Sequence, residues 1–329
     1  MVNFAFNEAM SEAVSENYLD DFLGIGGLEF EKAERDLAAM RETARVCGIP
    51  VSAEKLVGPV TRLDFLGFTI DTLEMSVSVP AEKRARYRTD LESWNGSRKE
   101  LESLLGKLLH VTSVIMMARP FLYRMRKRML LCEVDSEAVR FGFQEEQDRL
   151  WWADLLKNWV GTSLLTHRVW RCSPDFVLQA DAAGSVGFGI VFGREWAGGS
   201  WNWQERPVER VSNIAVLELV PLVLAAKMWG HRWQRARILF QTDNKVVADC
   251  GISWSPKHPH LAKLFRVLAS LAIENSFEIK IEHLPGVLNV SADAILRGNW
   301  ATFRLSNPEA NVDPCSVPQE FLNFLLSKF

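Results

Sequence analysis

The sequence predicts a mixed α/β protein in which a helical middle segment separates two strand-containing parts. Its 329 residues are 48% hydrophobic and 24% charged, which is enough to bury a core and excludes wholesale disorder. Residues 81–160 have helical periodicity, whereas short apolar runs bounded by turn residues occur on both sides of them. The order of elements in the C-terminal half predicts a mixed five-stranded sheet flanked by helices.

Two predicted hairpins and one helix account for the first 80 residues. Residues 17–27 are two apolar runs around an acidic turn, and residues 63–79 read as a second hairpin. The helix between them is predicted from apolar residues at helical spacing, which are Ala33, Leu37, Met40 and Ala44.

The helical middle segment carries two apolar stripes and an excess of positive charge. The stripes are Leu101, Leu104, Leu105 and Leu108, then Trp151, Trp152, Leu155, Leu156 and Trp159. Residues 81–130 contain 12 Lys and Arg against five Asp and Glu, whereas residues 1–80 contain six against 14. A basic block between acidic neighbours is a candidate surface for a polyanion, and a solvated helix face is the alternative.

Strands and helices alternate in the C-terminal half. Three consecutive antiparallel strands are predicted within 176–192 and 197–203, and two further strands at 237–242 and 277–284. Helices are predicted at 213–234 and 259–275, and a short helix follows the last strand.

Four acidic residues occupy informative positions in this half. Asp181 lies in an apolar strand, Glu218 in an apolar helix, Asp243 at the end of the next central strand, and Asp293 at the start of the last helix. Each has an ordinary structural interpretation when taken alone. Clustered carboxylates repel one another, and divalent cations with a preference for oxygen ligands, usually Mg²⁺, relieve that repulsion. Two such ions can promote the in-line displacement of a phosphodiester.

A resemblance to the ribonuclease H domain of retroelement reverse transcriptases extends over five segments: LQADAAGSVGFGIVFG, WAGGSWNW, NIAVLELVPLVLAAKMWG, RILFQTDNKVVADCG and HLPGVLNVSADAILR. The resemblance implies that Asp181, Glu218, Asp243 and Asp293 are catalytic and hold two Mg²⁺ ions, with Mn²⁺ as a substitute. It also implies that His283 assists proton transfer or product release; an ordinary loop histidine is the alternative. The segments ELVPLVLAAKMWG and SWSPKHPHLAKLFRVL are similar to retroelements that encode a tyrosine recombinase, of the DIRS and Ngaro type.

The N-terminal half resembles other parts of a reverse transcriptase. The YLDD segment, with Tyr18, Asp20 and Asp21, matches the catalytic turn of the palm, and LDFLGFTI resembles the hairpin that follows it. The basic helices resemble the thumb and connection, which implies sequence-independent phosphate contacts. The residues implied in those contacts are Lys83, Arg84, Arg86, Arg88, Arg124, Arg126, Lys127 and Arg128.

A polymerase site needs a third carboxylate, which the family places many tens of residues upstream of the paired acids. Too few residues precede Asp20 to contain that part of the palm. We therefore expect an N-terminally truncated palm with an incomplete polymerase site.

These resemblances divide the chain into a partial palm (1–80), a helical thumb and connection (81–170), a ribonuclease H-like domain (171–300) and a C-terminal linker (301–329). The expected activity is metal-dependent hydrolysis of the RNA strand of an RNA–DNA hybrid. One alternative is a catalytically inactive remnant that binds nucleic acid. Another is a full RNA-directed DNA polymerase completed by the missing fingers and palm; other polyprotein domains are further expected partners.

The sequence also suggests a location in the cell. The N-terminus lacks the pattern of a signal peptide, and no run approaches the roughly 18–20 apolar residues of a membrane span. Five scattered cysteines favour a reducing compartment. We expect an intracellular protein, cytoplasmic or nuclear, that is neither secreted nor membrane-bound.

Overall fold

The computed structural model describes residues 14–26, 29–132, 138–159, 163–164, 176–201 and 213–327. The chain divides into two compact units. The first comprises Met1–Lys83 and Val160–Thr166, and the second comprises Arg84–Trp159 and His167–Phe329.

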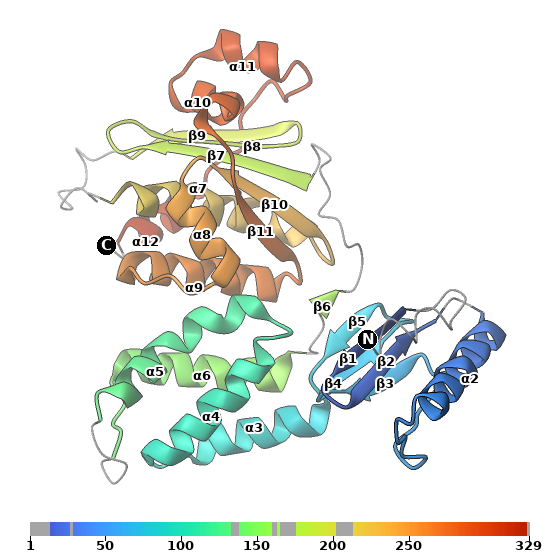
Figure 1. Cartoon of the computed structure of the whole chain (residues 1–329). Coiled ribbons are helices and arrows are strands. Elements are labelled where there is room, and N and C mark those ends of the chain that lie inside the picture. The colour runs from blue at the N-terminus through green and yellow to red at the C-terminus, as the bar shows by residue number, and fades with distance from the viewer. Residues whose placement is uncertain are drawn as a thin grey trace. The chain divides into compact units, whose positions relative to one another are not determined.

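Over its described residues, the first unit contains two small antiparallel sheets and one helix (Figure 1). Its elements are β1 (Val14–Tyr18), β2 (Asp21–Ile25), α2 (Phe30–Val46), β3 (Arg62–Phe65), β4 (Phe68–Asp71), β5 (Ser76–Ser78) and β6 (Ser163–Leu164). Strands β1 and β2 form the predicted acidic-turn hairpin. Residues 63–79, predicted as a single hairpin, instead contribute three strands, because a second turn at 72–75 reverses the chain again.

Helix α2 contains all four residues of the predicted apolar stripe. Ala44 is buried against Phe22, Met40 and Ile49, so part of the predicted apolar stripe faces the hairpin β1–β2. Gly48 follows the helix with a φ of +69°, a left-handed conformation that glycine adopts without strain.

The second unit begins with the predicted helical segment. Its elements are α3 (Ala81–Ser93), α4 (Arg98–Val111), η1 (Met116–Phe121), α5 (Tyr123–Leu130) and α6 (Phe143–Asn158). All four leucines of the first predicted stripe are buried on α4. Ser97 caps α4, since its side chain accepts a hydrogen bond from the Glu100 amide.

Buried ion pairs join these helices to a helix of the C-terminal half. Asp148 on α6 lies between Arg124 on α5 and Arg266 on α9 (Pro259–Glu274), with nitrogen–oxygen distances of 3.4 Å to both. Phe121 stacks on Trp151, and the Trp151 indole donates to the Ser270 hydroxyl at 3.3 Å. The helical segment and the sheet therefore share one packed unit.

The rest of the second unit is a mixed five-stranded sheet with helices on both faces (Figure 1). The order is β11-β10-β7-β8-β9, and β10 runs parallel to β7 and β11. This arrangement confirms the predicted fold class. The strands are β7 (Val177–Ala183), β8 (Gly187–Phe192), β9 (Glu195–Ser200), β10 (Arg237–Thr242) and β11 (Glu278–His283). The helices are α7 (Ile214–Trp229), η3 (Gly230–Arg232), α8 (Lys245–Ser253), α9, η4 (Gly286–Leu288), α10 (Val290–Leu296), α11 (Trp300–Ser306) and α12 (Gln319–Leu326).

Helix α7 is the central helix of this unit. It is apolar on every side, as expected of a helix that is surrounded by protein. Among the described helices, Ile214–Arg232 alone is long and apolar enough to cross a membrane, and 78% of that window is buried within the fold. Asn213 begins the helix by accepting a hydrogen bond from the Ala215 amide.

Two glycines let α10 lie directly on the sheet. Gly189 and Gly198 face each other on β8 and β9. A Cβ at Gly189 would overlap the carbonyl oxygen of Ala292, and a Cβ at Gly198 would lie 2.7 Å from Ile295. Glycine at both positions therefore permits the close approach of α10.

The segment predicted as a linker, 301–329, packs on the sheet over its described residues. The Asn311 amide donates to the carbonyl of Arg194, directly before the outer strand β9, and the Cys315 amide donates to the carbonyl of Trp196 within it, both at 2.8 Å. Phe303 is fully buried beside Trp196, and α12 packs on α7 through Leu322, Leu325 and Leu326. The fold thus continues beyond residue 300.

Two alanine substitutions are expected to change stability in opposite directions. Gly189→Ala would lower the free energy of unfolding by about 1–3 kcal/mol, because the new methyl group collides with backbone that must shift. Gly106→Ala would raise it by up to about 1 kcal/mol, because Gly106 lies in the interior of α4 with open space around it. Urea unfolding followed by circular dichroism measures both. Equal stability of the two variants would contradict the close packing of α10.

Candidate metal centre

The site lies where the order of strands in the sheet reverses. From β7 the chain proceeds to β8 and β9 on one side, and β10 and β11 lie on the other side. The parallel neighbours β7 and β10 thus flank a topological switch point, and ligands of open α/β sheets bind outside the carboxyl ends of such strands.

Asp181 lies near the carboxyl end of β7. It is 7% exposed, and its Oδ1 accepts a hydrogen bond from the Ala182 amide at 2.8 Å. Asp181 is opposite Gly189 on β8, so the two residues share the sheet face on which α10 packs.

Asp243 is the first residue after β10. Asn244 follows it and caps α8, accepting a hydrogen bond from the Val247 amide at 3.1 Å. The Thr242 hydroxyl also accepts a hydrogen bond, at 3.2 Å, from the Asn244 amide. These contacts hold the turn that presents Asp243 at the end of its strand.

Glu218 enters the site from the buried helix α7. It is 4% exposed, and its Oε2 is buried with no hydrogen-bond partner in the described part of the chain. A buried carboxylate oxygen without a partner is costly, and a bound cation is one way to satisfy it.

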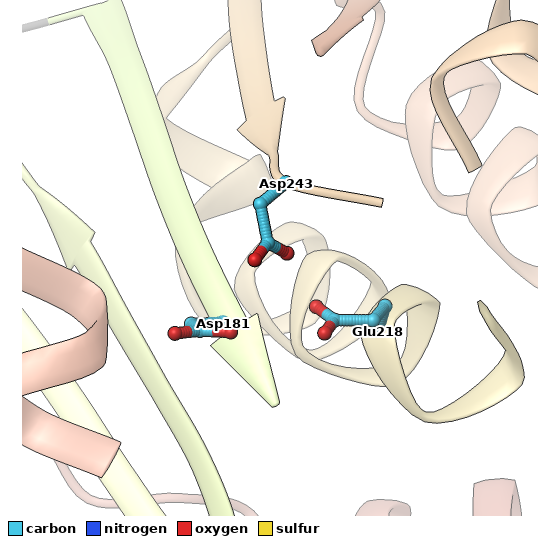
Figure 2. Close-up of side chains that lie close together, drawn as sticks. All are labelled: Asp181, Glu218 and Asp243. Carbon is cyan, nitrogen blue, oxygen red and sulfur yellow. The ribbon is translucent and has the colours of Figure 1, made fainter. Parts of the chain in front are cut away.

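The three carboxylates converge. Figure 2 shows Asp181 near the tip of β7, Asp243 just beyond β10 and Glu218 reaching toward both from α7. One ligand oxygen from each lies within 4.8 Å of the others. The sequence predicted this convergence for four acids, and the structure brings these three together.

Asp293 has a different partner. Its Oδ1 accepts a 2.5 Å hydrogen bond from the Nε of Arg297, four residues later on the same helix. The charge of Asp293 still contributes to raising the pKa of Asp181, after burial and the charge of Asp243. The fourth predicted acid thus stands beside the group, ion-paired with Arg297.

Burial and mutual repulsion favour the protonated forms of two of these acids. Burial first, and then the charge of Asp243, raise the pKa of Asp181 to about 6. The same two causes, with a contribution from Asp181, raise the pKa of Glu218 to about 9. The Ala182 amide acts in the opposite direction on both. Without a cation, this cluster therefore resists full ionisation near neutral pH.

His283 lies within the strand predicted at 277–284; it is the last residue of β11 and is exposed. Its Nε2 lies 3.0 Å from the carbonyl oxygen of Asp243. This contact places the imidazole at the edge of the acid cluster.

The donor set suits a hard divalent cation. All three converging ligands are carboxylate oxygens, and the described residues contain no other group of His, Cys, Asp and Glu with this geometry. Mg²⁺ prefers oxygen ligands, and its charge would offset both the repulsion and the unpartnered Glu218 oxygen. The cluster thus fits the predicted cofactor.

The predicted polymerase residues lie in the other compact unit. Asp20 is in the exposed turn between β1 and β2, and Tyr18 pairs with Asp21 across the hairpin. The described part of that unit brings no third metal-ligating residue to the two aspartates.

The eight predicted phosphate contacts fall into two groups. Exposed side chains belong to Arg86, Arg126, Lys127 and Arg128, and half-buried ones to Lys83, Arg84, Arg88 and Arg124. The Arg84 guanidinium donates to the Trp159 carbonyl, and Arg124 pairs with the buried Asp148. Both arginines are therefore engaged within the fold, and so is Arg128, whose Nε donates to the Arg140 carbonyl at 2.7 Å.

Sequence reasoning missed Arg297, Asn244 and Gly189, which contact or position the acids of the site. The i,i+4 spacing of Asp293 and Arg297 is a sequence signal for their ion pair. Asn244, directly after Asp243 and before a helix, carries the signal of a helix cap. Gly189 gives no local signal, because its need for close packing arises from a distant helix.

No protein-family model and no curated protein sequence matches this chain. Among solved structures, the chain is similar to a foamy viral protease–reverse transcriptase, a dRH form in complex with double-stranded DNA. The identity is 13% and the TM-score 0.40, over 82% of this chain and 46% of that one. The foamy viral protease–reverse transcriptase in complex with an RNA/DNA hybrid is 13% identical, with a TM-score of 0.39, over 84% and 36%.

A third similar structure is ribonuclease H1 from the halophilic archaeon Halobacterium salinarum NRC-1. It is 14% identical with a TM-score of 0.28, over 38% of this chain and 95% of that one. The chain spans less than half the length of either viral chain.

The pKa shifts predict how stability depends on pH without metal. The pKa values of Asp181 and Glu218 lie above their ordinary values of 3.8 and 4.5, so the folded state binds more protons than the unfolded state. The unfolding free energy should therefore fall as pH rises through 6 toward 9. Glu218→Gln should flatten this fall in EDTA and raise the melting temperature at alkaline pH. The exposed Glu274→Gln is the matched control, and an unchanged slope in Glu218→Gln would contradict the assignment.

Proposed function

We propose that this chain hydrolyses the RNA strand of an RNA–DNA hybrid in a metal-dependent reaction, as part of a retroelement reverse transcriptase and ribonuclease H region. The observation that carries the proposal is the convergence of Asp181, Glu218 and Asp243 at the switch point of a mixed sheet. The acids come from a strand, a buried helix and a strand end, in the order that the sequence resemblance requires.

The residues of the chain have distinct tasks in this proposal. Asp181, Glu218 and Asp243 would hold Mg²⁺, and Asp293 would join them when a cation competes with Arg297 for its carboxylate. When bound, a pair of divalent cations supplies Lewis acidity to the attacking water and the leaving 3′ oxygen. His283 would accept or donate a proton at the exposed edge of the cluster, or assist product release.

The basic helices would extend the binding surface for the hybrid. Exposed Arg126 and Lys127 on α5, with Arg86 and Arg128, would meet phosphates without reading the base sequence. Recognition would then depend on the shape of the hybrid and on its 2′-hydroxyls. We further assign the chain to the tyrosine-recombinase class of retroelements, on the sequence resemblance alone. We assign it to the cytoplasm or nucleus because its scattered cysteines favour a reducing compartment.

A second candidate function is RNA-directed DNA synthesis completed by another polypeptide. The exposure of Asp20 and Asp21 at the tip of the hairpin β1–β2 favours it, because both carboxylates remain accessible to a surface that brings a third acid. Polymerisation that appears only when fingers and palm are supplied would distinguish this candidate from the nuclease.

Cleavage of an end-labelled RNA–DNA hybrid by the purified chain in Mg²⁺ tests the first proposal. We expect cutting of the RNA strand alone, reduced about 10³-fold or more in Asp243→Asn, since each factor of ten corresponds to about 1.4 kcal/mol of barrier. The exposed Asp249→Asn on α8 is the matched control and should cut normally. In EDTA, Asp243→Asn should melt at the same or a higher temperature, because it removes repulsion. A folded wild-type protein that binds the hybrid and leaves it whole would support the non-catalytic alternative.

The contribution of the basic helices can be measured separately. Arg126→Ala combined with Lys127→Ala should weaken hybrid binding about equally for all sequences and reduce the salt slope by about 1 to 2. Arg41→Ala combined with Arg45→Ala on α2 removes the same charge from the acidic unit and is the control. If both double variants lose the same amount of hybrid affinity, α5 is not part of the binding surface.

A further inference from the structure

A buried asparagine lies where β7 and β10 separate. Asn289 is 1% exposed, and its Nδ2 donates to the carbonyl oxygen of Ala180 at 3.0 Å. The ladder between the two strands ends at the pair Gln179 and Gln241. The bonded carbonyl therefore belongs to the first residue beyond the ladder, directly before Asp181.

The loop that carries Asn289 also contacts the other acid-bearing elements. The carbonyl of Asn289 accepts a hydrogen bond from the Asp293 amide at 3.1 Å, at the start of α10. Gly286 lies against Asp243, since a Cβ there would be 3.3 Å from Oδ2. The Leu284 amide donates to the Thr242 carbonyl at 2.9 Å. One short loop thus touches the strand of Asp181, the turn of Asp243 and the helix of Asp293.

The amide of Asn289 is only half satisfied. Its Oδ1 is buried and has no hydrogen-bond partner within the described ranges. An apolar side chain with the same branching, such as leucine, would avoid that unmet acceptor but would leave the Ala180 carbonyl without this donor. The donor, rather than the volume of the side chain, accounts for an asparagine at this position.

We propose that Asn289 is a positioning residue of the metal centre, which ties the loop between His283 and Asp293 to the strand that carries Asp181. Its hydrogen bond sets how closely the fourth carboxylate and the histidine approach the three converging acids. This inference rests on the proposed metal-dependent function and assigns the task to one side chain that itself contacts neither metal nor substrate.

The test uses Asn289→Ala and Asn289→Leu in the full chain. The matched control is Asn275→Ala, which removes a similar 2.8 Å bond to the Leu271 carbonyl at the end of α9. One readout is the rise in melting temperature as Mg²⁺ is added, and the other is the separation of kcat from KM for the hybrid. We expect the half-saturating Mg²⁺ concentration to increase about 10- to 100-fold in both Asn289 variants, with kcat lowered and KM little changed. Asn275→Ala should respond to Mg²⁺ as the wild type does.

The outcomes separate this inference from the proposed function. Asn289→Leu retains a well-filled interior, so it answers the question even where the alanine variant fails to fold. A normal Mg²⁺ response and normal kcat in Asn289→Leu would overturn the positioning role and leave Asn289 a packing residue. If wild-type protein responds to Mg²⁺ but does not cleave, the proposed function fails, and the Mg²⁺ titrations still decide the role of Asn289. A wild type without any Mg²⁺ response would overturn the inference itself.

Discussion

The second unit is arranged around three carboxylates that repel one another: Asp181 and Asp243 at the ends of β7 and β10, and Glu218 on α7. Three acids within 4.8 Å of one another, two of them almost fully buried, oppose folding unless the surrounding protein holds them in place. Helix α7 does this by burying apolar residues around Glu218 on every side. The close contact of α10 with Gly189 and Gly198 holds the opposite face of the sheet.

Much of this fold is readable from sequence periodicity. The strand at 237–242, β10, has the predicted bounds. Helix α9 and strand β11, which were predicted at 259–275 and 277–284, each begin and end within one residue of those bounds. Their apolar residues recur at strand or helix spacing, and Pro259, Asn275 and Pro285 lie at or near the ends of α9 and β11, so local pattern and tertiary burial agree. The hairpin predicted at 63–79 failed as a single unit because two turns close together divide it into three strands.

The site is less completely encoded in local pattern. Acids inside apolar elements identify Asp181 and Glu218, because burial of a carboxylate is costly without a partner. Asp243 is identified by its position directly after a central strand. Sequence alone could not show that Arg84 and Arg124 are engaged within the fold, since their partners lie 75 and 24 residues away. The same holds for Asn289, whose hydrogen bond spans 109 residues. Counting Lys and Arg in the sequence therefore overestimates how many positive side chains are free to bind a ligand. Local sequence spacing, in turn, misses residues such as Asn289 that support the site from a distant part of the chain.

The C-terminal segment along β9 has a consequence for self-association. An outer strand presents unpaired amide and carbonyl groups that can recruit a strand from another molecule. Here the Cys315 amide donates a hydrogen bond to the Trp196 carbonyl on that strand, and the Asn311 amide donates to the carbonyl of Arg194, which directly precedes the strand. Arg304 holds the segment by donating to the carbonyls of Ala310, Asn311 and Val312. The C-terminal segment thus covers part of the edge of β9. A shortened form ending near residue 300 would expose unpaired backbone groups of this edge strand, together with the apolar surface of Trp196, and would therefore self-associate more readily.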